Sequence, residues 1–364
     1  MENTAILLAN GYYRTVYAKT SHGLVRGPSR FPIAAVVDAT CAGQDAGTLL
    51  DGRHRDIPIF ASLAEAITHG ASTGAAPGHC IVGVANPGGV LPPDLRADLV
   101  TAAEAGMSLV NGLHQLLSDD PEFVDLAGRH GGGLVDIRKP PPTSELRFWS
   151  GEILDLEVPR VAVLGTDCAL GKRTTSSLLH RALRDDGVRA EMIYTGQTGW
   201  LQGYPHGFIF DATPNDFVCG ELEGALLACA RDTDPQVILI EGQSSLRNPS
   251  GPCGAEFLLS GGAKGVILLH APGRRCFEGL EEAGCEIGGV AREIELIRLY
   301  GSEVLGIGIH TEGLSDAEAE DHRTRIETDT GLPTVLPLRD GVDRLAAAVA
   351  DHCGLGDPGG SSRS

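Results

Sequence analysis

The strongest chemical signal in this sequence is a phosphate-binding pattern at residues 161–183, VAVLGTDCALGKRTTSSLLHRAL. An apolar run leads through a glycine-bearing turn into an amphipathic helical stretch. Such a turn directs several backbone N–H groups and the positive end of a helix dipole toward one point, which suits a phosphate. Lys172 adds a positive charge, and Thr174 or Thr175 offers a hydroxyl group to a magnesium ion. The predicted phosphate-binding residues are Gly165, Thr166, Asp167, Gly171, Lys172, Arg173, Thr174 and Thr175.

The spacing of this loop departs from the usual Gly-x-x-x-x-Gly-Lys-[Ser/Thr] pattern in two places. Gly165 stands one position early, and Arg173 occupies the place of the hydroxyl residue. The run from Gly165 to Lys172 instead resembles the Gly-Thr-Asp-x-x-x-Gly-Lys-Thr loop of dethiobiotin synthetase and its relatives. The alternative is a glycine-rich turn that binds nothing. Because strand, loop and helix occur in the required order, the pattern favours phosphate binding.

A second polar cluster, Glu241-Gly242-Gln243-Ser244-Ser245, follows the apolar run at residues 237–240. Parallel α/β sheets bind ligands at the carboxyl ends of their strands, so this cluster lies in the expected place. The dethiobiotin synthetase group likewise ends a buried strand in Glu-Gly beside its phosphate site. We predict that Glu241 holds a metal ion or the reacting amine. The alternative is a solvated strand end, since turns are routinely polar.

Two aspartates between these clusters are candidate metal ligands. A magnesium site near Thr174 and Glu241 needs another oxygen ligand, which Asp211 or Asp216 can supply. Asp216 also precedes a helical stretch, so a simple helix cap is the alternative for that residue. If ATP is the cosubstrate, the predicted metal ligands are Thr174, Asp211 and Glu241.

Two further segments offer groups that bind a substrate. Gln197 and Thr198 lie in a turn rich in hydrogen-bond donors, for which a plain turn is an equal alternative. His270 and Arg274 follow the apolar run at residues 266–269. Arginine suits bidentate recognition of a carboxylate or phosphate, whereas a lone histidine is often structural. The predicted substrate-binding residues are Gln197, Thr198, His270 and Arg274.

Short apolar runs that alternate with helical stretches must position these groups. The runs are bounded by Gly, Pro or Asp and are typical of buried parallel strands, so they predict two α/β domains. The expected strands cover residues 6–9, 33–37, 57–60, 80–84, 108–110, 134–137, 160–164, 191–194, 208–210, 237–240, 266–269, 304–309 and 334–336. The expected helices include residues 63–68, 95–105, 173–184, 217–230 and 317–328.

A proline-rich segment after Lys139 cannot continue a strand and indicates a connector between the two domains. We predict a Rossmann-like parallel sheet over residues 1–139 and a linker over 140–158. A domain resembling P-loop NTPases follows over 159–354. The last residues, 355–364, contain little to bury and predict a disordered tail.

Composition excludes several classes of function. The 364 residues carry a formal charge of −19, so a nucleic acid is not an expected partner. No apolar run approaches the roughly 18 residues of a membrane span, and membrane contact is not expected. Nine cysteines without a Cys-x-x-Cys pair indicate a reducing compartment, and we expect a cytoplasmic protein.

The chain as a whole resembles a family of two-domain P-loop proteins that includes D-glutamate N-acetyltransferases. In the first half the resemblance rests on residues 36–38, 42–43, 83–89, 91–93, 112–114 and 118–123. In the second half it rests on residues 165–167, 171–175, 195–199, 216–217, 241–243 and 270–274. Arg173, unusual for a generic phosphate loop, is expected within this family.

The resemblance implies transfer of an acetyl group from acetyl-CoA to the amine of an acidic amino acid such as D-glutamate. A phosphate loop can serve coenzyme A as well as ATP, because both carry a pyrophosphate. The reaction needs a base for the ammonium proton and donors for the oxyanion. Glu241 or Asp216 is the candidate base, and Gln243, Ser244 or loop amides are the candidate donors. We expect a small-molecule amino-acid substrate and a homo-oligomer.

Two other functions remain open at the level of sequence. An ATP- and magnesium-dependent kinase or ligase would activate a carboxylate, with Lys172 stabilising the transferred phosphoryl group. A nucleotide-sensing module would bind its ligand without turnover. Metal dependence separates the first from acyl transfer, since phosphoryl transfer normally requires a divalent ion.

Overall fold

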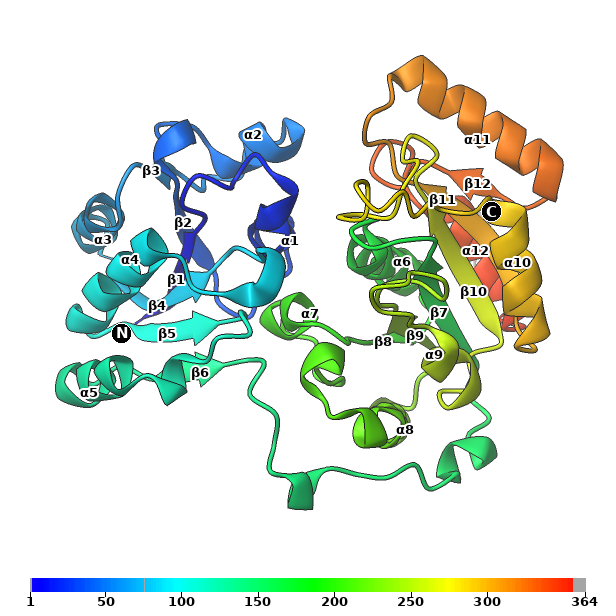
Figure 1. Ribbon diagram of the computed structural model, residues 1–364, viewed down its shortest axis with the longest axis horizontal. Helices are drawn as coiled ribbons and strands as arrows, with labels where there is room; N and C mark the ends of the chain where they lie inside the picture. The colour runs from blue at the N-terminus through cyan, green and yellow to red at the C-terminus, as the bar shows by residue number, and fades with distance from the viewer. Residues whose placement is uncertain (1, 75, 356–364) are drawn as a thin grey trace, which may run out of the picture. The chain divides into compact units, whose positions relative to one another are not determined.

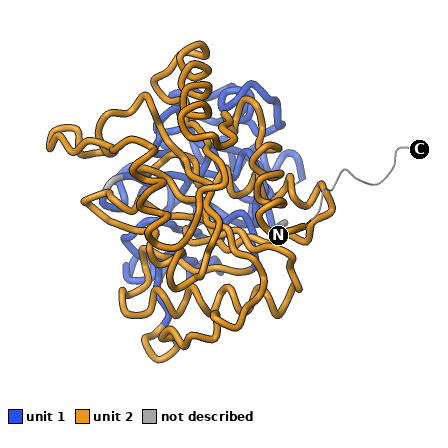
Figure 2. The backbone as a smooth tube through the Cα atoms, turned by 90° about the vertical axis from the view of Figure 1, so that its right-hand side faces the viewer, with its two compact units in different colours: residues 1–141, 197–205 blue, residues 142–196, 206–364 orange. Residues whose placement is uncertain are grey.

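The computed structural model describes residues 2–74 and 76–355, which form two compact units (Figure 2). The first unit comprises residues 1–141 and 197–205, and the second comprises residues 142–196 and 206–364. The division falls between Pro141 and Pro142, inside the proline-rich segment, two residues after the predicted end of the first domain. The predicted disordered tail lies, from residue 356 onward, outside the described residues.

The first unit is built on a six-stranded parallel sheet with the order β3-β2-β1-β4-β5-β6 (Figure 1). Its strands are β1 (Glu2–Leu8), β2 (Ile33–Val37), β3 (Ile59–Phe60), β4 (Pro77–Val82), β5 (Ser108–Asn111) and β6 (Leu134–Asp136). Its helices are α1 (Lys19–Arg26), α2 (Ala46–Asp51), α3 (Leu63–Ser72), α4 (Pro93–Glu104), α5 (Pro121–His130) and α7 (Gln197–Leu201). This strand order is that of a Rossmann-like fold, as predicted.

The second unit contains another six-stranded parallel sheet, with the order β12-β11-β10-β7-β9-β8 (Figure 1). Its strands are β7 (Arg160–Gly165), β8 (Ala190–Ile193), β9 (Val237–Glu241), β10 (Gly265–His270), β11 (Glu303–Ile309) and β12 (Thr334–Val335). Its helices are α6 (Lys172–Asp185), α8 (Asn215–Thr233), α9 (Ala255–Leu259), α10 (Val290–Leu299), α11 (Asp316–Thr330) and α12 (Asp343–His352).

Each sheet is covered by helices whose apolar side chains face it. In the second unit Leu222 and Leu226 of α8, Phe257 of α9 and Ile297 of α10 pack in one core with the strands. Helices α6 and α12 contact each other and the strands. Strands buried on both faces need continuous apolar runs, which is why β7, β9 and β10 were visible in the sequence. The predicted α/β architecture with two parallel sheets is confirmed.

One predicted strand is wrong. Residues 208–210 form no ladder: Gly207 makes a single bridge to Tyr194, and Phe210–Ala212 is a short 3-10 helix. Phe208 and Phe210 are apolar because they pack into the core beside Phe257, with ring centroids of Phe210 and Phe257 5.6 Å apart. The short apolar run that predicted a strand here belongs instead to buried residues outside the sheet.

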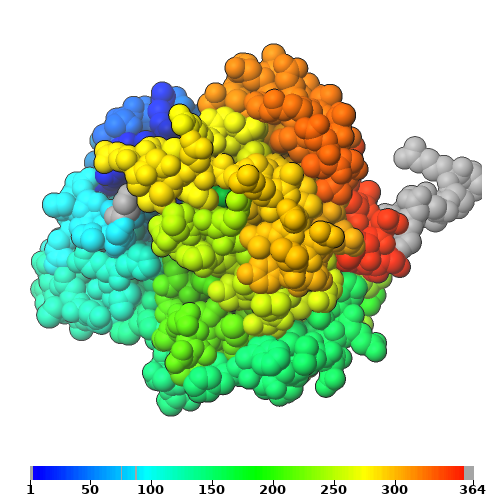
Figure 3. All heavy atoms as spheres, turned by 45° about the vertical axis from the view of Figure 1, so that its right-hand side comes forward, coloured from blue at the N-terminus to red at the C-terminus, as the bar shows by residue number. Residues whose placement is uncertain are grey.

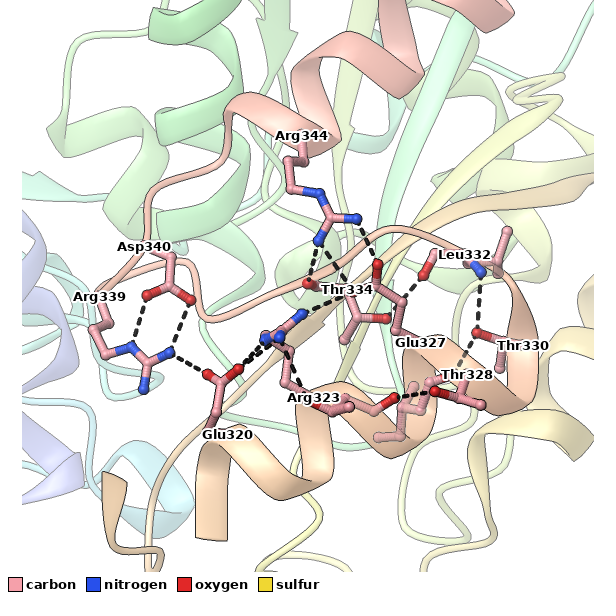
Figure 4. Close-up of polar contacts among 12 residues, drawn as sticks. Glu320, Arg323, Glu327, Thr328, Thr330, Leu332, Thr334, Arg339, Asp340 and Arg344 are labelled. Atoms are coloured by element: carbon pink, nitrogen blue, oxygen red, sulfur yellow. Dashed lines mark hydrogen bonds and ion pairs between the residues drawn. The ribbon is translucent and has the colours of Figure 1, made fainter. Parts of the chain in front are cut away.

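Helix α11 lies at the surface, where it appears in orange in Figure 3, and polar side chains join it to the following segments. Figure 4 shows these contacts. Arg323 donates to Glu327 at 2.8 Å, and Arg344 of α12 donates to both oxygens of Glu327 at 2.6 and 3.0 Å. Arg339 joins Glu320 to Asp340. Only Ala319 and Ile326 of α11 are buried, so these ion pairs supplement a narrow apolar contact.

Replacement of Glu327 tests this network. Hydrogen bonds from Arg344 hold the pKa of Glu327 below its ordinary value of 4.5, so its contribution to stability is present above that pH and is lost as the pH falls. We expect Glu327→Gln to lower the free energy of unfolding of the second unit by up to about 1 kcal/mol at pH 7. The loss should shrink in 1 M salt, because screening weakens exposed ion pairs.

Urea unfolding followed by the fluorescence of Trp149 measures this change, in a Trp200→Phe background that removes the tryptophan of the first unit. Glu295→Gln, at an exposed site of α10, is the matched control. Equal losses for the two variants at low and high salt would show that the network does not stabilise the unit.

Candidate functional site

The phosphate loop lies between β7 and α6, as predicted from the sequence. Gly171 immediately precedes the helix with a φ of 83°, a left-handed conformation that favours glycine. Gly171, the residue before this 14-residue helix, has no side chain that could cap it. The N-terminus of the helix carries the positive end of the helix dipole, which attracts an anion.

Lys172 is the first residue of α6 and is only 7% exposed. Its Nζ donates to the backbone oxygen of Asp167 at 2.6 Å and to that of Ser244 at 2.8 Å. The ammonium group therefore joins the phosphate loop to the turn after β9. Lys172 is thus a positive charge that two backbone oxygens hold in place at the loop.

Asp167, a predicted cofactor-binding residue, is surrounded by donors of the protein itself. Its side chain is fully buried and accepts hydrogen bonds from Arg274 at 2.7 Å, from the backbone N–H of Glu278 at 2.8 Å and from Asn248 at 3.2 Å. These three donors come from the loops after β10 and β9. Asp167 is accordingly a positioning residue that holds the phosphate loop against its neighbours.

The predicted substrate residues His270 and Arg274 also face the interior of the site. Arg274 donates to Asp167, to the backbone oxygen of Cys168 at 2.9 Å and to Glu312 at 2.8 Å. The His270 ring lies 3.0 Å from the hydroxyl of Thr166, and burial lowers the pKa of this histidine to about 4. His270 is hence neutral at physiological pH. Both side chains support the loop, and their contacts give no direct sign of a substrate.

Glu241 lies at the carboxyl end of β9, beside the end of β8. Its carboxylate accepts a hydrogen bond from the backbone N–H of Thr195 at 3.1 Å. The Thr195 hydroxyl donates to the backbone oxygen of Glu241 at 2.8 Å and accepts from the Gln243 amide at 2.9 Å. The structure thus brings the candidate base Glu241 and the candidate oxyanion donor Gln243 together around Thr195.

Burial dominates the electrostatics of Glu241, which is 5% exposed. Desolvation raises the pKa of Glu241 to about 7, although the Thr195 N–H and the positive charges of Arg173 and Lys172 pull it down. A carboxyl group with such a pKa exchanges protons near neutral pH, which is what a general acid or base requires. Because the positive charges of Lys172 and Arg173 lower the pKa of Glu241, this carboxyl group lies within the electrostatic field of the phosphate loop.

Ser244 adopts a φ of 33°, which is uncommon for a residue with a side chain and costs about 1 kcal/mol or more. The turn aims its backbone oxygen at Lys172, while its hydroxyl accepts from the Cys168 thiol at 3.6 Å. Strain of this kind gathers at functional sites. The predicted catalytic residues Glu241, Gln243 and Ser244 lie in one turn, which is next to the phosphate loop and contains this strained residue.

Asp216 and Asp211 lie at the start of α8 and just before it. Asp216 is exposed in the first turn of α8, and within residues 2–74 and 76–355 no hydrogen bond or ion pair joins it to Glu241. Asp211 is exposed in the short 3-10 helix before α8. Among the described residues no group of three or more His, Cys, Asp or Glu is arranged to hold a metal ion. The set Thr174, Asp211 and Glu241 stays a prediction tied to ATP.

The other predicted ligands divide between the two units. Arg173 donates to the Thr174 hydroxyl at 3.2 Å, and Thr175 is 2% exposed, so Thr175 faces the core. Gln197 and Thr198 belong to the first unit and to helix α7, not to a flexible turn. Gln197 accepts from Arg138 at 3.1 Å, and the Thr198 hydroxyl lies 3.2 Å from that of Thr20.

Asn248 is a site residue that sequence reasoning missed. It is fully buried, and its amide donates to Asp167 and to the Cys168 sulfur, the latter at 3.7 Å. Its side-chain oxygen accepts from the backbone N–H of Ser250 at 3.0 Å. The Asn-Pro pair at residues 248–249 signals a turn, but nothing in the sequence shows that this turn reaches the phosphate loop.

Comparison with known proteins identifies relatives of both domains. Residues 147–346 match a family described as "Domain of unknown function (DUF1611_C) P-loop domain". Residues 39–140 match a family described as "Domain of unknown function (DUF1611_N) Rossmann-like domain". A crystal structure of a DUF1611 family protein from Anabaena variabilis is similar with a TM-score of 0.85 and 30% identity, and the match covers 96% of this chain and 100% of that one.

Two relatives carry the name D-glutamate N-acetyltransferase. The protein from Tritonibacter scottomollicae is 32% identical over 297 residues, which are 79% of this chain and 84% of the relative. The protein from Pseudoalteromonas sp is 32% identical over 293 residues, which are 79% of this chain and 83% of the relative. No helix among the described residues is both long and apolar enough to cross a membrane.

Glu241→Gln tests the buried carboxyl group through stability. Because the pKa of Glu241 is raised from 4.5 to about 7, its contribution to stability is fully present below pH 4.5 and is lost as the pH rises through 7. Glutamine keeps an acceptor for the Thr195 N–H and does not ionise. We expect the variant to be more stable than the wild type at pH 8, by up to about 3 kcal/mol, with a much smaller difference at pH 5.

Urea unfolding of the second unit at pH 5 and pH 8, followed by Trp149 fluorescence in the Trp200→Phe background, measures the difference. Glu157→Gln, at an exposed position, is the control and should show no such pH dependence. A Glu241→Gln protein that is equally destabilised at both pH values would contradict the assigned titration.

Proposed function

The chain belongs to the two-domain DUF1611 family, and from this premise we propose that it is an N-acyltransferase that moves the acetyl group of acetyl-CoA to the amine of an acidic amino acid such as D-glutamate. The family resemblance predicted from the sequence is confirmed. The observation that carries the proposal is the buried Glu241, whose pKa of about 7 suits a base, beside the N-terminus of α6. The names of the two relatives support the choice of reaction.

The phosphate loop fits a pyrophosphate by its donors. The positive end of the α6 dipole lies at this loop, and Lys172 and Arg173 supply positive charge in a chain of net charge −19. The backbone of Gly171, Lys172 and Arg173 is the proposed holder of the coenzyme A pyrophosphate. Bound acetyl-CoA supplies an activated thioester. The protein then has to bind the acceptor, accept a proton and stabilise charge.

Glu241 is the proposed base. The acceptor amine enters as an ammonium ion, and the Glu241 carboxylate takes one of its protons. The amine nitrogen then forms a bond to the thioester carbon and loses its second proton, while the carbon–sulfur bond breaks. The coenzyme A thiolate that leaves takes up this second proton, and Glu241 returns the first proton to solvent. With a pKa near 7, Glu241 is substantially deprotonated at neutral pH and still basic enough to accept a proton.

Gln243 is the proposed donor to the oxyanion. One N–H of its amide is fixed by the Thr195 hydroxyl at 2.9 Å, which orients the second N–H of the same group. A preoriented donor stabilises developing negative charge without reorganising during the reaction. The Ser244 hydroxyl, which accepts from Cys168, lies next along the same strained turn. Thr195 therefore acts as a positioning residue for both Glu241 and Gln243.

Ligand binding separates this proposal from the ATP-dependent alternative. We expect acetyl-CoA and CoA to raise the melting temperature of the full chain without magnesium, because a ligand that binds only the folded state stabilises it. Lys172→Ala should abolish the shift, whereas Lys264→Ala, at an exposed lysine, should keep it. Because Lys172 also braces the loop, Arg173→Ala serves as a second loop variant and should weaken the shift. A shift only with ATP and magnesium would overturn the proposal in favour of a kinase or ligase.

Kinetics tests the two candidate bases. Glu241→Gln should lower kcat by about 10²- to 10⁴-fold, the usual contribution of a general base, while acetyl-CoA binding persists. The wild-type kcat/KM should rise with pH through an inflection near 7 that the variant lacks. Asp216→Asn should stay close to wild type because Asp216 is exposed on α8. Coenzyme A release from acetyl-CoA and D-glutamate, measured with a thiol reagent, reports the rate. Full activity in Glu241→Gln would reject this base.

A further inference from the structure

Arg247 lies in the loop after β9 and is held by a buried carboxylate outside the site described so far. Its Nε donates to Oε2 of Glu293 at 2.7 Å. The Glu293 side chain, on α10, is 2% exposed, while that of Arg247 is 31% exposed. Burial raises the pKa of Glu293, which means that folding desolvates this carboxyl group at a cost. One end of the guanidinium group is therefore anchored in the protein and the other reaches solvent.

Gly288 provides the surface on which this guanidinium group lies. A Cβ atom at position 288 would clash with both terminal nitrogens, Nη1 and Nη2, of Arg247. A side chain at position 288 would thus push the guanidinium group away. Gly288 belongs to the loop at residues 271–289, which is yellow in Figure 3 and lies at the surface. Because Gly288 has no side chain, the planar guanidinium group of Arg247 rests against the backbone there, which fixes the orientation of the guanidinium plane.

The two terminal nitrogens of Arg247 make no hydrogen bond or ion pair with the described parts of the chain, 2–74 and 76–355. An arginine fixed at Nε and open at both terminal nitrogens presents the edge that binds a carboxylate or phosphate in bidentate fashion. Most other arginines near the site, such as Arg274, have their nitrogens occupied by protein groups.

The loop that carries Arg247 is tied to the phosphate loop on both sides. Asn248, the next residue, donates to Asp167, and the backbone oxygen of Ser244 accepts from Lys172. These contacts hold the loop to the site rather than leaving it free at the surface. In a chain with a net charge of −19, a fixed positive group at this place creates local attraction for an anionic ligand.

We propose that Arg247 is a recognition residue for an anionic group of the reactants, and that Glu293 and Gly288 are positioning residues for it. The group is either a carboxylate of the acidic amino acid or a phosphate of coenzyme A, since both match the bidentate edge. This inference rests on the proposed acyl transfer and adds the residue that gives that reaction its preference for an anionic reactant.

Binding and kinetics of the full chain test the proposal with Arg247→Ala, Arg247→Lys and the matched control Arg292→Ala, an exposed arginine next to Glu293. The ligands are acetyl-CoA, its 3′-dephospho analogue, D-glutamate and D-glutamine. We expect Arg247→Ala to raise the Kd or KM of one reactant by about tenfold or more, as lost charged hydrogen bonds do. Arg247→Lys should recover little of it, because lysine lacks the bidentate edge. Arg292→Ala should stay at wild-type values.

The pattern of losses identifies the group that is bound. A loss for acetyl-CoA that disappears with the dephospho analogue assigns the 3′-phosphate, and a loss for acetyl-CoA that persists assigns the pyrophosphate. A loss for D-glutamate but not D-glutamine assigns the side-chain carboxylate, and a loss for both amino acids assigns the α-carboxylate. Glu293→Ala should raise the same KM with little change in kcat, and Glu293→Gln, which keeps an acceptor for Nε, should recover most of the affinity.

Values within twofold of wild type for every ligand in Arg247→Ala would overturn the inference, even if acetyl transfer is observed. Absence of acetyl transfer in the wild type, with Arg247-dependent binding of acetyl-CoA measured by calorimetry, would instead reject the proposed reaction and retain Arg247 as an anion-binding residue. Equal losses in Arg247→Ala and Arg292→Ala would also overturn it, since they would reflect net charge alone.

Discussion

The buried carboxylate of Asp167 is the interaction on which the rest of the site depends. A fully buried charge is tolerated only when donors surround it, and here Arg274, Asn248 and the Glu278 backbone supply them. These donors come from the loops that follow β9 and β10, and Asp167 itself lies in the loop that follows β7. The need to satisfy one carboxylate thereby fixes the position of three loops at the carboxyl edge of the sheet. Arg274 extends the same network to the backbone of Cys168.

Around this network, burial and positive charge act on Glu241 in opposite directions. Desolvation disfavours the carboxylate, while Lys172, Arg173 and the Thr195 N–H favour it, and the balance leaves its pKa at about 7. If Lys172 were more solvated, its attraction would be weaker; its two backbone acceptors keep the ammonium group close. The geometry of the phosphate loop and the basicity of Glu241 are therefore coupled through the same buried lysine.

Much of the fold was predictable because local patterns carry it. Parallel strands covered on both faces require unbroken apolar runs, and twelve of the expected strands, including β7, β9 and β10, occur where those runs lie. The failure at residues 208–210 has a definite cause, since Phe208 and Phe210 are buried by packing without joining the ladder. Likewise Gln197 and Thr198, expected in a turn of the second domain, are helical and belong to the first unit. An apolar run in the sequence indicates that its residues are buried, but it does not indicate which element they pack against.

For the site, the sequence by itself determined the phosphate loop, the Glu-Gly-Gln-Ser turn and their places at the ends of buried strands, because each depends on neighbours in the chain. It also determined the family. Only the tertiary structure decided which polar groups contact one another: Arg274 donates to Asp167, the His270 ring lies against Thr166, and burial raises the pKa of Glu241 to about 7. Burial, hydrogen-bond partners and the pairing of Arg247 with Glu293 arise between residues that are distant along the chain. Such contacts are set by packing in three dimensions, and no local pattern of residue types encodes them.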